Sequence, residues 1–435
     1  MKRDSNVKGE STKECGFQLR LGKGYSITQD PSMPQNTNLL VIGASGSRKT
    51  RSIISPTILE AKGSYIISDP KGSLYKRYGN YLRGKGMDVF VVDFTHPEKS
   101  SHYNPFFFIR TELDILKVAQ AIIGKAESEI EPFWDHLALI LLSSLIAYIV
   151  ETRSVEDQNF KTLFTLLQDC IPNLSGKSNL DDYMEKLGKR NPESFAYKQY
   201  KKVKVCPQKT FSCVIATVEA KIGQFDCGDL HMMMDKNETD FMYLGQNPAA
   251  IFTIISDTDR SLDKLASIFF TQAFQELTRY ADNYCINESL PMPVRFILDD
   301  FATNLKIDNF PSIISSVRSR NISIMLAIQS EGQLKAIYGE DGQTIISNCD
   351  TVAYLGCNDI ESAQHAAIKA DKPVKQMLNL SPGYGWVFRR GEEARFVELL
   401  DRDSCEREAG YEETKTKEEL DIQPGLVIGP FNIEF

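Results

Sequence analysis

Apolar runs of strand length alternate with stretches of helical spacing at the beginning of the chain. Residues 39–42, 64–69 and 88–93 are short and apolar, and each is followed within a few residues by glycine or proline. Runs closed by such turn-forming residues predict buried strands. Residues 51–59 and 74–84 have the apolar spacing of helices. Strand, helix, strand, helix, strand in this order predicts a parallel sheet covered by helices.

The pattern changes after residue 110. From 111 to 245 apolar residues recur at helical spacing, and strand signals nearly vanish. The candidate helices cover residues 111–124, 132–151, 160–170, 179–187, 192–204 and 209–223. We therefore expect an all-α domain that is inserted into the sheet domain.

The sheet pattern resumes at residue 246. Strands are predicted at 249–255, 294–299, 323–328 and 351–355, helices at 261–281 and 310–318, and a closing hairpin at 384–389 and 395–399. The expected fold class is α/β, with one sheet domain formed by residues 37–110 and 246–405 around the inserted all-α domain, residues 111–245. Residues 1–36 are expected to be a polar lead-in with a strand pair at 17–21 and 25–28, and residues 406–435 a polar tail.

Composition narrows the class of protein. The 435 residues are 42% hydrophobic and 25% charged, as in a globular protein, and the net charge of −8 excludes a uniformly basic nucleic-acid coat. DNA contact would therefore need local basic patches or a ring of subunits. The nine cysteines include no Cys-x-x-Cys pair, which predicts reduced thiols and no zinc site. The apolar run 137–150 is too short to span a bilayer, so we expect a core helix and a chain that does not cross a membrane.

The inserted domain carries the main basic cluster. It comprises Lys186, Lys189, Arg190, Lys198, Lys201, Lys202, Lys204 and Lys209, with Phe195, Tyr197 and Tyr200 interleaved. This mixture is typical of a surface that binds nucleic acid. A solvated helix face with lysines extended over apolar surface explains it equally well.

The segment between the first strand and the first helix has the layout of a phosphate-binding loop. Its small residues are Gly43, Ala44, Ser45, Gly46 and Ser47. Lys49 is placed to reach the β- and γ-phosphates of a nucleotide, and the Thr50 hydroxyl to bind Mg²⁺. Arg48 departs from the motif G-x-x-x-x-G-K-[ST], which has glycine there because a side chain crowds the backbone around the phosphates. The alternative is a Gly/Ser-rich turn that binds no ligand.

A pair of carboxylates follows a later apolar strand. Asp299 and Asp300 come directly after residues 296–298, which is the Walker B pattern. Asp299 is expected to orient the ligands of the metal, and Asp300 to act as the base that activates water. Asp300 is one methylene shorter than the glutamate often found there. A helix cap without a metal is the alternative.

Two further polar residues belong to the candidate site. Gln329 ends the strand 323–328, where its amide can sense a γ-phosphate or orient water, or simply cap the next helix. Arg318 precedes that strand and can serve as an arginine finger toward a neighbouring subunit, although surface arginines are common.

Several ordered motifs between residues 38 and 400 resemble the TraG-type coupling proteins of type IV secretion. They are D-P-K-G at 69–72, Y-N-P at 103–105, P-F-W at 132–134, I-S-D-T-D at 255–259, L-D-D-F-A at 298–302, and the stretch from Arg318 through Gln329 to Y-G at 338–339. The resemblance implies a RecA-like P-loop NTPase motor domain with an inserted all-α domain. By position it matches Lys49, Thr50, Asp299, Asp300, Gln329 and Arg318 to the family's nucleotide-site residues.

The resemblance also implies a function. It implies ATP and Mg²⁺ as cofactors, a hexamer around DNA, ATP-driven DNA translocation, and a relaxase and the components of a type IV secretion channel as partners. It implies a cytoplasmic position at the inner face of a bacterial cytoplasmic membrane, with membrane contact through partners. The family's N-terminal membrane helices are not seen, which indicates a soluble variant, a truncated form or a wrongly assigned start.

Two other functions stay open. A docking adaptor without catalysis, which recruits a relaxase or another protein substrate, is suggested by Arg48 and Asp300. A chromosome-partitioning DNA pump of the FtsK/HerA type would share the P-loop fold, but the D-P-K-G and D-T-D motifs disfavour it.

Overall fold

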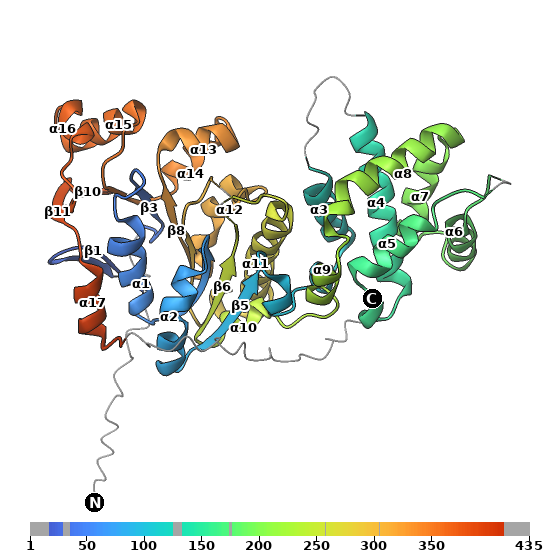
Figure 1. The fold of residues 1–435 in the computed structure, drawn as a ribbon, viewed down its shortest axis with the longest axis horizontal. Helices are drawn as coiled ribbons and strands as arrows, with labels where there is room; N and C mark the ends of the chain where they lie inside the picture. Colours follow the sequence, from blue (N-terminus) through green and yellow to red (C-terminus); the bar gives the residue numbers. More distant parts are fainter. Residues whose placement is uncertain are drawn as a thin grey trace, which may run out of the picture.

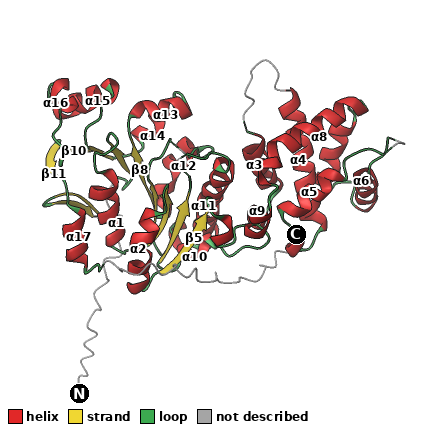
Figure 2. Ribbon diagram, viewed as in Figure 1, coloured by secondary structure: helices red, strands yellow, loops and turns green. Residues whose placement is uncertain are grey.

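The computed structural model describes residues 17–28, 35–124, 133–173, 176–256, 258–303 and 305–412. A sheet domain and a group of helices lie side by side, with the strands confined to the sheet domain (Figures 1 and 2). The expected α/β fold class is confirmed.

One nine-stranded sheet organises the first part. Its order is β11-β10-β9-β3-β8-β7-β4-β6-β5. The strands are β3 (Leu39–Ile42), β4 (Ser64–Asp69), β5 (Asp88–Asp93), β6 (Ala249–Ile254), β7 (Val294–Leu298), β8 (Ile322–Ile328), β9 (Thr351–Tyr354), β10 (Tyr384–Arg389) and β11 (Arg395–Glu398). Strands β9 through β5 are parallel, and β10 and β11 form the predicted antiparallel hairpin. Every residue of β3 is buried, as expected for a strand covered on both faces.

Helices cover both faces of the sheet. Leu39 and Val41 of β3 pack into a core that includes Ile53, whereas Leu40 and Ile42 face a second core that includes Phe269. The first face carries α1 (Ser55–Leu59), α2 (Ser73–Gly84), α17 (Arg402–Ala409) and the antiparallel pair β1 (Gln18–Gly22) and β2 (Tyr25–Thr28). The second carries α11 (Asp263–Tyr284), α12 (Phe310–Ser316), α13 (Glu331–Tyr338), α14 (Asp341–Ser347), α15 (Ile360–Ala370) and α16 (Val374–Leu378).

The described elements between β5 and β6 are all helices, joined by turns and loops. Its α-helices are α3 (Glu112–Ile123), α4 (Phe133–Thr152), α5 (Phe160–Gln168), α6 (Asn179–Arg190), α7 (Phe195–Lys204), α8 (Gln208–Ile222), α9 (Gly228–Met233) and α10 (Phe241–Leu244). The helices match the predicted ones to within a few residues. Pro132, which we expected at the entry to α4, lies outside the described residues.

Helix α4 is longer than its apolar run suggested. Its 20 residues make it the one described helix that is long and apolar enough to cross a membrane, with a hydropathy of 1.8. Ala138 and every residue from Leu141 to Ile149 are buried, and the helix packs against α3, α7 and α8. This packing is that of a core helix.

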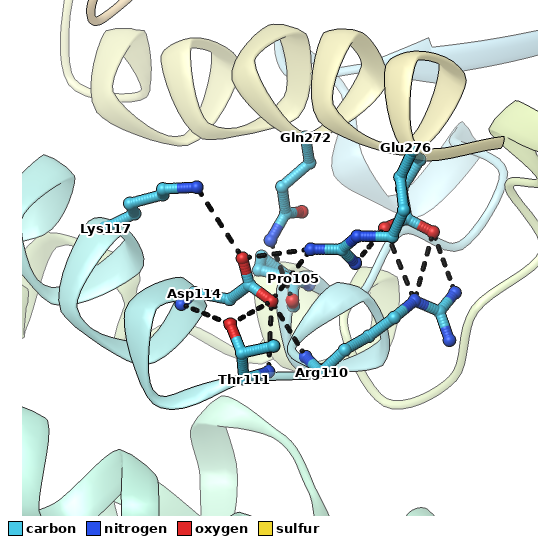
Figure 3. A network of polar contacts seen from close by, with 8 residues as sticks. Pro105, Arg110, Thr111, Asp114, Lys117, Gln272 and Glu276 are labelled. Atoms are coloured by element: carbon cyan, nitrogen blue, oxygen red, sulfur yellow. Dashed lines mark hydrogen bonds and ion pairs between the residues drawn. The ribbon is translucent and has the colours of Figure 1, made fainter. Parts of the chain in front are cut away.

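An ion-pair network joins the helical segment to the sheet domain (Figure 3). Glu276 of α11 binds Arg110 and Arg279, each at 2.7 Å, and Arg279 also binds Asp114 of α3 at 3.0 Å. Both carboxylates are buried. Thr111 caps α3 together with Asp114. The network fixes the start of α3 against α11.

The boundary expected at residue 406 falls inside a packed helix. Glu406 of α17 is buried and accepts hydrogen bonds from Arg77 at 2.6 Å and from the Tyr78 hydroxyl at 2.9 Å. The ring of Tyr411 packs edge-on against Tyr78. Residues up to 412 therefore belong to the sheet domain, because partners distant in sequence stabilise the buried charge; the rest of the expected tail lies outside the described residues.

Candidate nucleotide-binding site

The carboxyl ends of neighbouring parallel strands place the predicted residues at one edge of the sheet. Ile42 of β3 is in register with Ile328 of β8, and Leu298 of β7 with Leu326. Gly43, which follows Ile42, donates its N–H to the Ile328 carbonyl at 3.1 Å. The loop after β3, Gln329 and Asp299 therefore leave adjacent strands at the same edge.

The loop after β3 is held by its own backbone and by one lysine. Lys49 is buried and its Nζ donates to the carbonyls of Gly43 at 2.7 Å and Ala44 at 3.3 Å. Ser47 N–H bonds the Ala44 carbonyl at 3.1 Å. A Cβ on Gly43 would lie 2.3 Å from Ser47 Oγ and 3.0 Å from Ser47 Cβ, so a side chain there would force Ser47 to shift. Burial lowers the pKa of Lys49, while the nearby carboxylates of Asp300 and Asp299 favour its charged form.

Arg48 adopts the backbone conformation for which this loop normally uses glycine. Its φ is +71°, in the left-handed region. The side chain is exposed, and among the described residues no hydrogen bond of its guanidinium holds the loop. The chain thus keeps the glycine-like turn at the cost of some backbone strain.

A π-helical turn begins the helix after the loop. Thr50–Ile54 form this turn, in which Ser55 N–H bonds the Thr50 carbonyl. Pro56 lacks an N–H and cannot bond the carbonyl of Ser52, which explains the wider turn.

Thr50 and Asp299 contact each other directly. Thr50 Oγ1 donates to Asp299 Oδ2 at 2.7 Å, although 249 residues separate them. Burial raises the pKa of Asp299 to about 6, and the bond from Thr50 acts in the opposite direction. Octahedral Mg²⁺ with oxygens at ~2.1 Å has neighbouring ligands ~3 Å apart, so two oxygens at this separation fit its coordination shell.

Asp300 lies in a strained loop directly beside this pair. The φ angle of Asp300 is +48° and that of Ala302 is +66°. The N–H of Asp300 donates to Asp299 Oδ1 at 3.0 Å. Two non-glycine residues in the left-handed region within three positions are uncommon and cluster at functional sites.

Of the remaining predicted residues, Gln329 lies at the site and Arg318 does not. Gln329 is half-buried at the tip of β8, beside the loop after β3. Arg318 is exposed in the turn Val317–Arg320, before β8 begins. The seven residues of β8 span about 20 Å, so Arg318 lies at the opposite edge of the sheet. The structure therefore brings Lys49, Thr50, Asp299, Asp300 and Gln329 together and leaves Arg318 apart.

Two further residues near this edge, Asp69 and Gln333, had no role predicted from the sequence. Asp69 at the end of β4 is buried and accepts the Tyr75 N–H at 2.9 Å, and burial raises its pKa. Gln333 contacts both Gln329 and Thr303. The D-P-K-G motif pointed to Asp69, whereas the only sequence signal for Gln333 is its place four residues after Gln329.

The predicted basic cluster is partly engaged within the protein. Lys204 binds Asp181 at 2.7 Å, and Lys198 binds Glu193. Lys201 lies 5.4 Å from the centre of the Tyr197 ring. Several of its charges therefore stabilise α6 and α7 themselves.

Comparison with known proteins identifies relatives of this chain. The family described as Type IV secretory system Conjugative DNA transfer matches residues 1–369. The type IV secretion system-coupling protein VirD4 of Bartonella henselae is 21% identical over 388 residues, 82% of this chain and 56% of the relative. VirD4 of Bartonella quintana is 22% identical over 354 residues, 76% of this chain and 52% of the relative. The chain thus spans about half the length of these curated relatives.

Solved structures share the fold. The plasmid coupling protein TrwB in complex with the ATP analogue ADPNP gives a TM-score of 0.64 at 15% identity, covering 84% of this chain and 85% of that one. VirB4 of Thermoanaerobacter pseudethanolicus gives 0.54 at 14% identity, covering 90% and 97%. These likenesses support an α/β P-loop NTPase fold with a helical domain. Because the family match covers most of its length, the chain belongs to the type IV secretion family of conjugative DNA-transfer proteins, the TraG-type coupling proteins.

Proposed function

We propose that this protein is a coupling ATPase that binds ATP with Mg²⁺ and uses its hydrolysis to recruit and move DNA, with a relaxase, to a type IV secretion channel. The observation that carries the proposal is the meeting of Lys49 with the Thr50–Asp299 pair at one sheet edge. Support for the cofactors comes from TrwB, which is described in complex with ADPNP and with ADP and Mg²⁺.

Each residue has a defined task in this proposal. Lys49 binds the phosphates together with the loop N–H groups other than those of Gly43, Ala44 and Ser47, which already bond protein carbonyls. Thr50, oriented by Asp299, would hold Mg²⁺. The metal, when bound, would neutralise negative charge on the phosphates. Asp300 accepts the proton of the attacking water and Gln329 orients that water. This arrangement is typical of phosphoryl transfer to water.

Arg318 fits only a site shared between subunits. It lies at the sheet edge opposite Lys49, so it cannot stabilise phosphate charge at the loop of its own chain. In a ring-shaped hexamer, the opposite edge of one subunit can face the nucleotide of the next. We propose that the protein acts as such a hexamer around DNA, peripheral to the inner face of a bacterial cytoplasmic membrane and attached there through its partners.

ATP hydrolysis by the full chain tests the proposal. The measurement is made with and without DNA, at protein concentrations that permit oligomers. We expect DNA-stimulated hydrolysis that is lost in Lys49→Ala and kept in Lys62→Ala, an exposed lysine outside the loop, and DNA binding that weakens steeply with salt. Absence of hydrolysis under all these conditions would overturn the proposal.

A docking adaptor of the same fold is the second candidate. The left-handed, non-glycine residues Arg48 and Asp300 favour it, since both depart from the usual nucleotide site. The double change Arg48→Gly and Asp300→Glu separates the two functions. A large gain in hydrolysis identifies the natural chain as an adaptor; little change identifies it as an active ATPase.

A further inference from the structure

The side-chain amide of Gln333 bridges two loops of the candidate site. Its Oε1 accepts the Gln329 N–H at 2.9 Å, and its Nε2 donates to Thr303 Oγ1 at 3.3 Å. Gln329 follows β8, and Thr303 follows β7 in the loop that contains Asp300. One amide therefore connects the ends of two neighbouring strands.

The loop held by this bridge adopts an unfavourable backbone. Asp300 and Ala302 both have positive φ, a left-handed conformation that is unfavourable for residues other than glycine. The Phe301 N–H bonds the Ala327 carbonyl of β8 at 2.9 Å, and Thr303 N–H bonds the Asp300 carbonyl at 3.1 Å. Such a backbone persists only where surrounding contacts over-determine it, and the Gln333 amide is one of these contacts.

The helix that carries Gln333 is itself anchored. The N–H of Glu331 bonds Ser362 Oγ of α15 at 2.9 Å, and Glu331 Oε2 contacts His365 at 2.5 Å. Leu334, next to Gln333, is fully buried. The amide is thus presented to both loops from an anchored helix.

We infer that Gln333 is a positioning residue that sets the distance between Asp300 and Gln329. The inference rests on the proposed function, in which these residues act on the same water molecule. The amide fits both partners, because its oxygen accepts from the Gln329 N–H while its NH₂ group donates to the Thr303 hydroxyl. A methionine at this position keeps the approximate shape of the side chain but makes neither hydrogen bond, so it releases both Gln329 and Thr303.

The decisive variants are Gln333→Met and Thr303→Val in the full chain, with Gln376→Met, at an exposed amide of α16, as the matched control. We expect kcat for ATP hydrolysis to fall about 10- to 100-fold in both variants, since misplacement of a reacting group by ~1 Å has such an effect. Nucleotide affinity should stay within about twofold, because neither residue contacts the loop after β3. The double variant should lose no more than Gln333→Met alone, because the bond that Thr303→Val removes is already absent there.

Other outcomes have definite meanings. Unchanged kcat in Gln333→Met overturns the inference, and so does a parallel loss of nucleotide affinity, which would indicate a merely structural role. If the unmodified chain does not hydrolyse ATP, the proposed function fails instead. Hydrogen exchange then tests the bridge by itself: faster exchange at residues 300–303 and 329 in Gln333→Met than in Gln376→Met supports it, and equal exchange overturns it.

Discussion

Position 48 shows how a single residue stores strain at the phosphate loop. An arginine at φ +71° keeps a turn that glycine would form without strain. The turn is retained because Lys49 and the Ser47 N–H tie the loop to its own carbonyls. Backbone hydrogen bonds therefore determine the conformation here, against the preference of the residue.

Replacing Arg48 with glycine should stabilise the protein by about 0.5–1 kcal/mol. Relief of strain in the folded state exceeds the extra freedom that glycine gives the unfolded chain. Urea unfolding measures the change. Ala61→Gly is a matched control outside the loop, since Ala61 also has positive φ, at 47°. A loss of stability in Arg48→Gly alone would show that the arginine side chain makes a stabilising contact.

Asp299 predicts a specific dependence of stability on pH. Its pKa of about 6 in the folded chain is above the ordinary value of 3.8, so the folded protein retains the proton longer than the unfolded one. Stability from this group is fully present below about pH 4 and is lost as the pH rises through 6. The variant Asp299→Asn cannot ionise, so it should not lose stability from this group as the pH rises.

Without nucleotide or Mg²⁺, Asp299→Asn should therefore be more stable than the natural chain, and its advantage should grow by about 1 kcal/mol between pH 5 and pH 8. Urea unfolding at the two pH values measures this difference. An advantage that is constant with pH would mean that the carboxylate titrates normally.

At the scale of elements, helix α11 links the sheet to the helical domain. Phe274 stacks on Phe296 of β7 with ring centroids 3.7 Å apart, and Glu276, two residues later, binds Arg110 and Arg279. The strand that ends at Asp299 is therefore connected through one helix to the start of α3. Movement at the site has a direct packing route to the helical domain.

Glu276→Gln should destabilise the protein by about 2–3 kcal/mol, because it leaves partly buried arginines without their shared carboxylate. Asp282→Asn on the same helix removes a more exposed ion pair with Arg320 and should cost less than about 1 kcal/mol. Denaturant unfolding compares the two. Equal losses would contradict the structural importance assigned to the network.

The sequence predicted the elements of the site better than their connections. The apolar runs that end at Ile42, Leu298 and Ile328 located the strand tips because a buried parallel strand has a continuous apolar pattern. The bridge by Gln333 could not be predicted, because a glutamine that bonds two loops and a glutamine that faces solvent look the same in the sequence of a short helix. The packed end at Glu406 was missed since its partners, Arg77 and Tyr78, are more than 300 residues away.

At the scale of the whole molecule, we propose that Arg318 completes the nucleotide site of a neighbouring subunit, because Lys49 and Arg318 lie at opposite edges of the sheet. Arg318→Ala and Lys49→Ala should each abolish hydrolysis in homogeneous assemblies. Mixed assemblies should regain part of the activity, because some interfaces pair an intact Lys49 with an intact Arg318. ATPase assays on mixtures at several ratios measure this. No recovery in mixtures shown to exchange subunits would contradict a finger acting between chains.

Mg²⁺-dependent nucleotide binding at the loop after β3 is the property on which every proposed role of the site residues depends. Calorimetric titration of the full chain with ADPNP, with and without Mg²⁺, is the decisive measurement, with Lys49→Ala and Lys62→Ala compared. We predict binding that requires Mg²⁺, is weakened about 10- to 100-fold in Lys49→Ala, as expected for a lost charge-assisted contact, and is unchanged in Lys62→Ala. Absence of binding to the natural chain, or equal affinity in Lys49→Ala, would contradict the account.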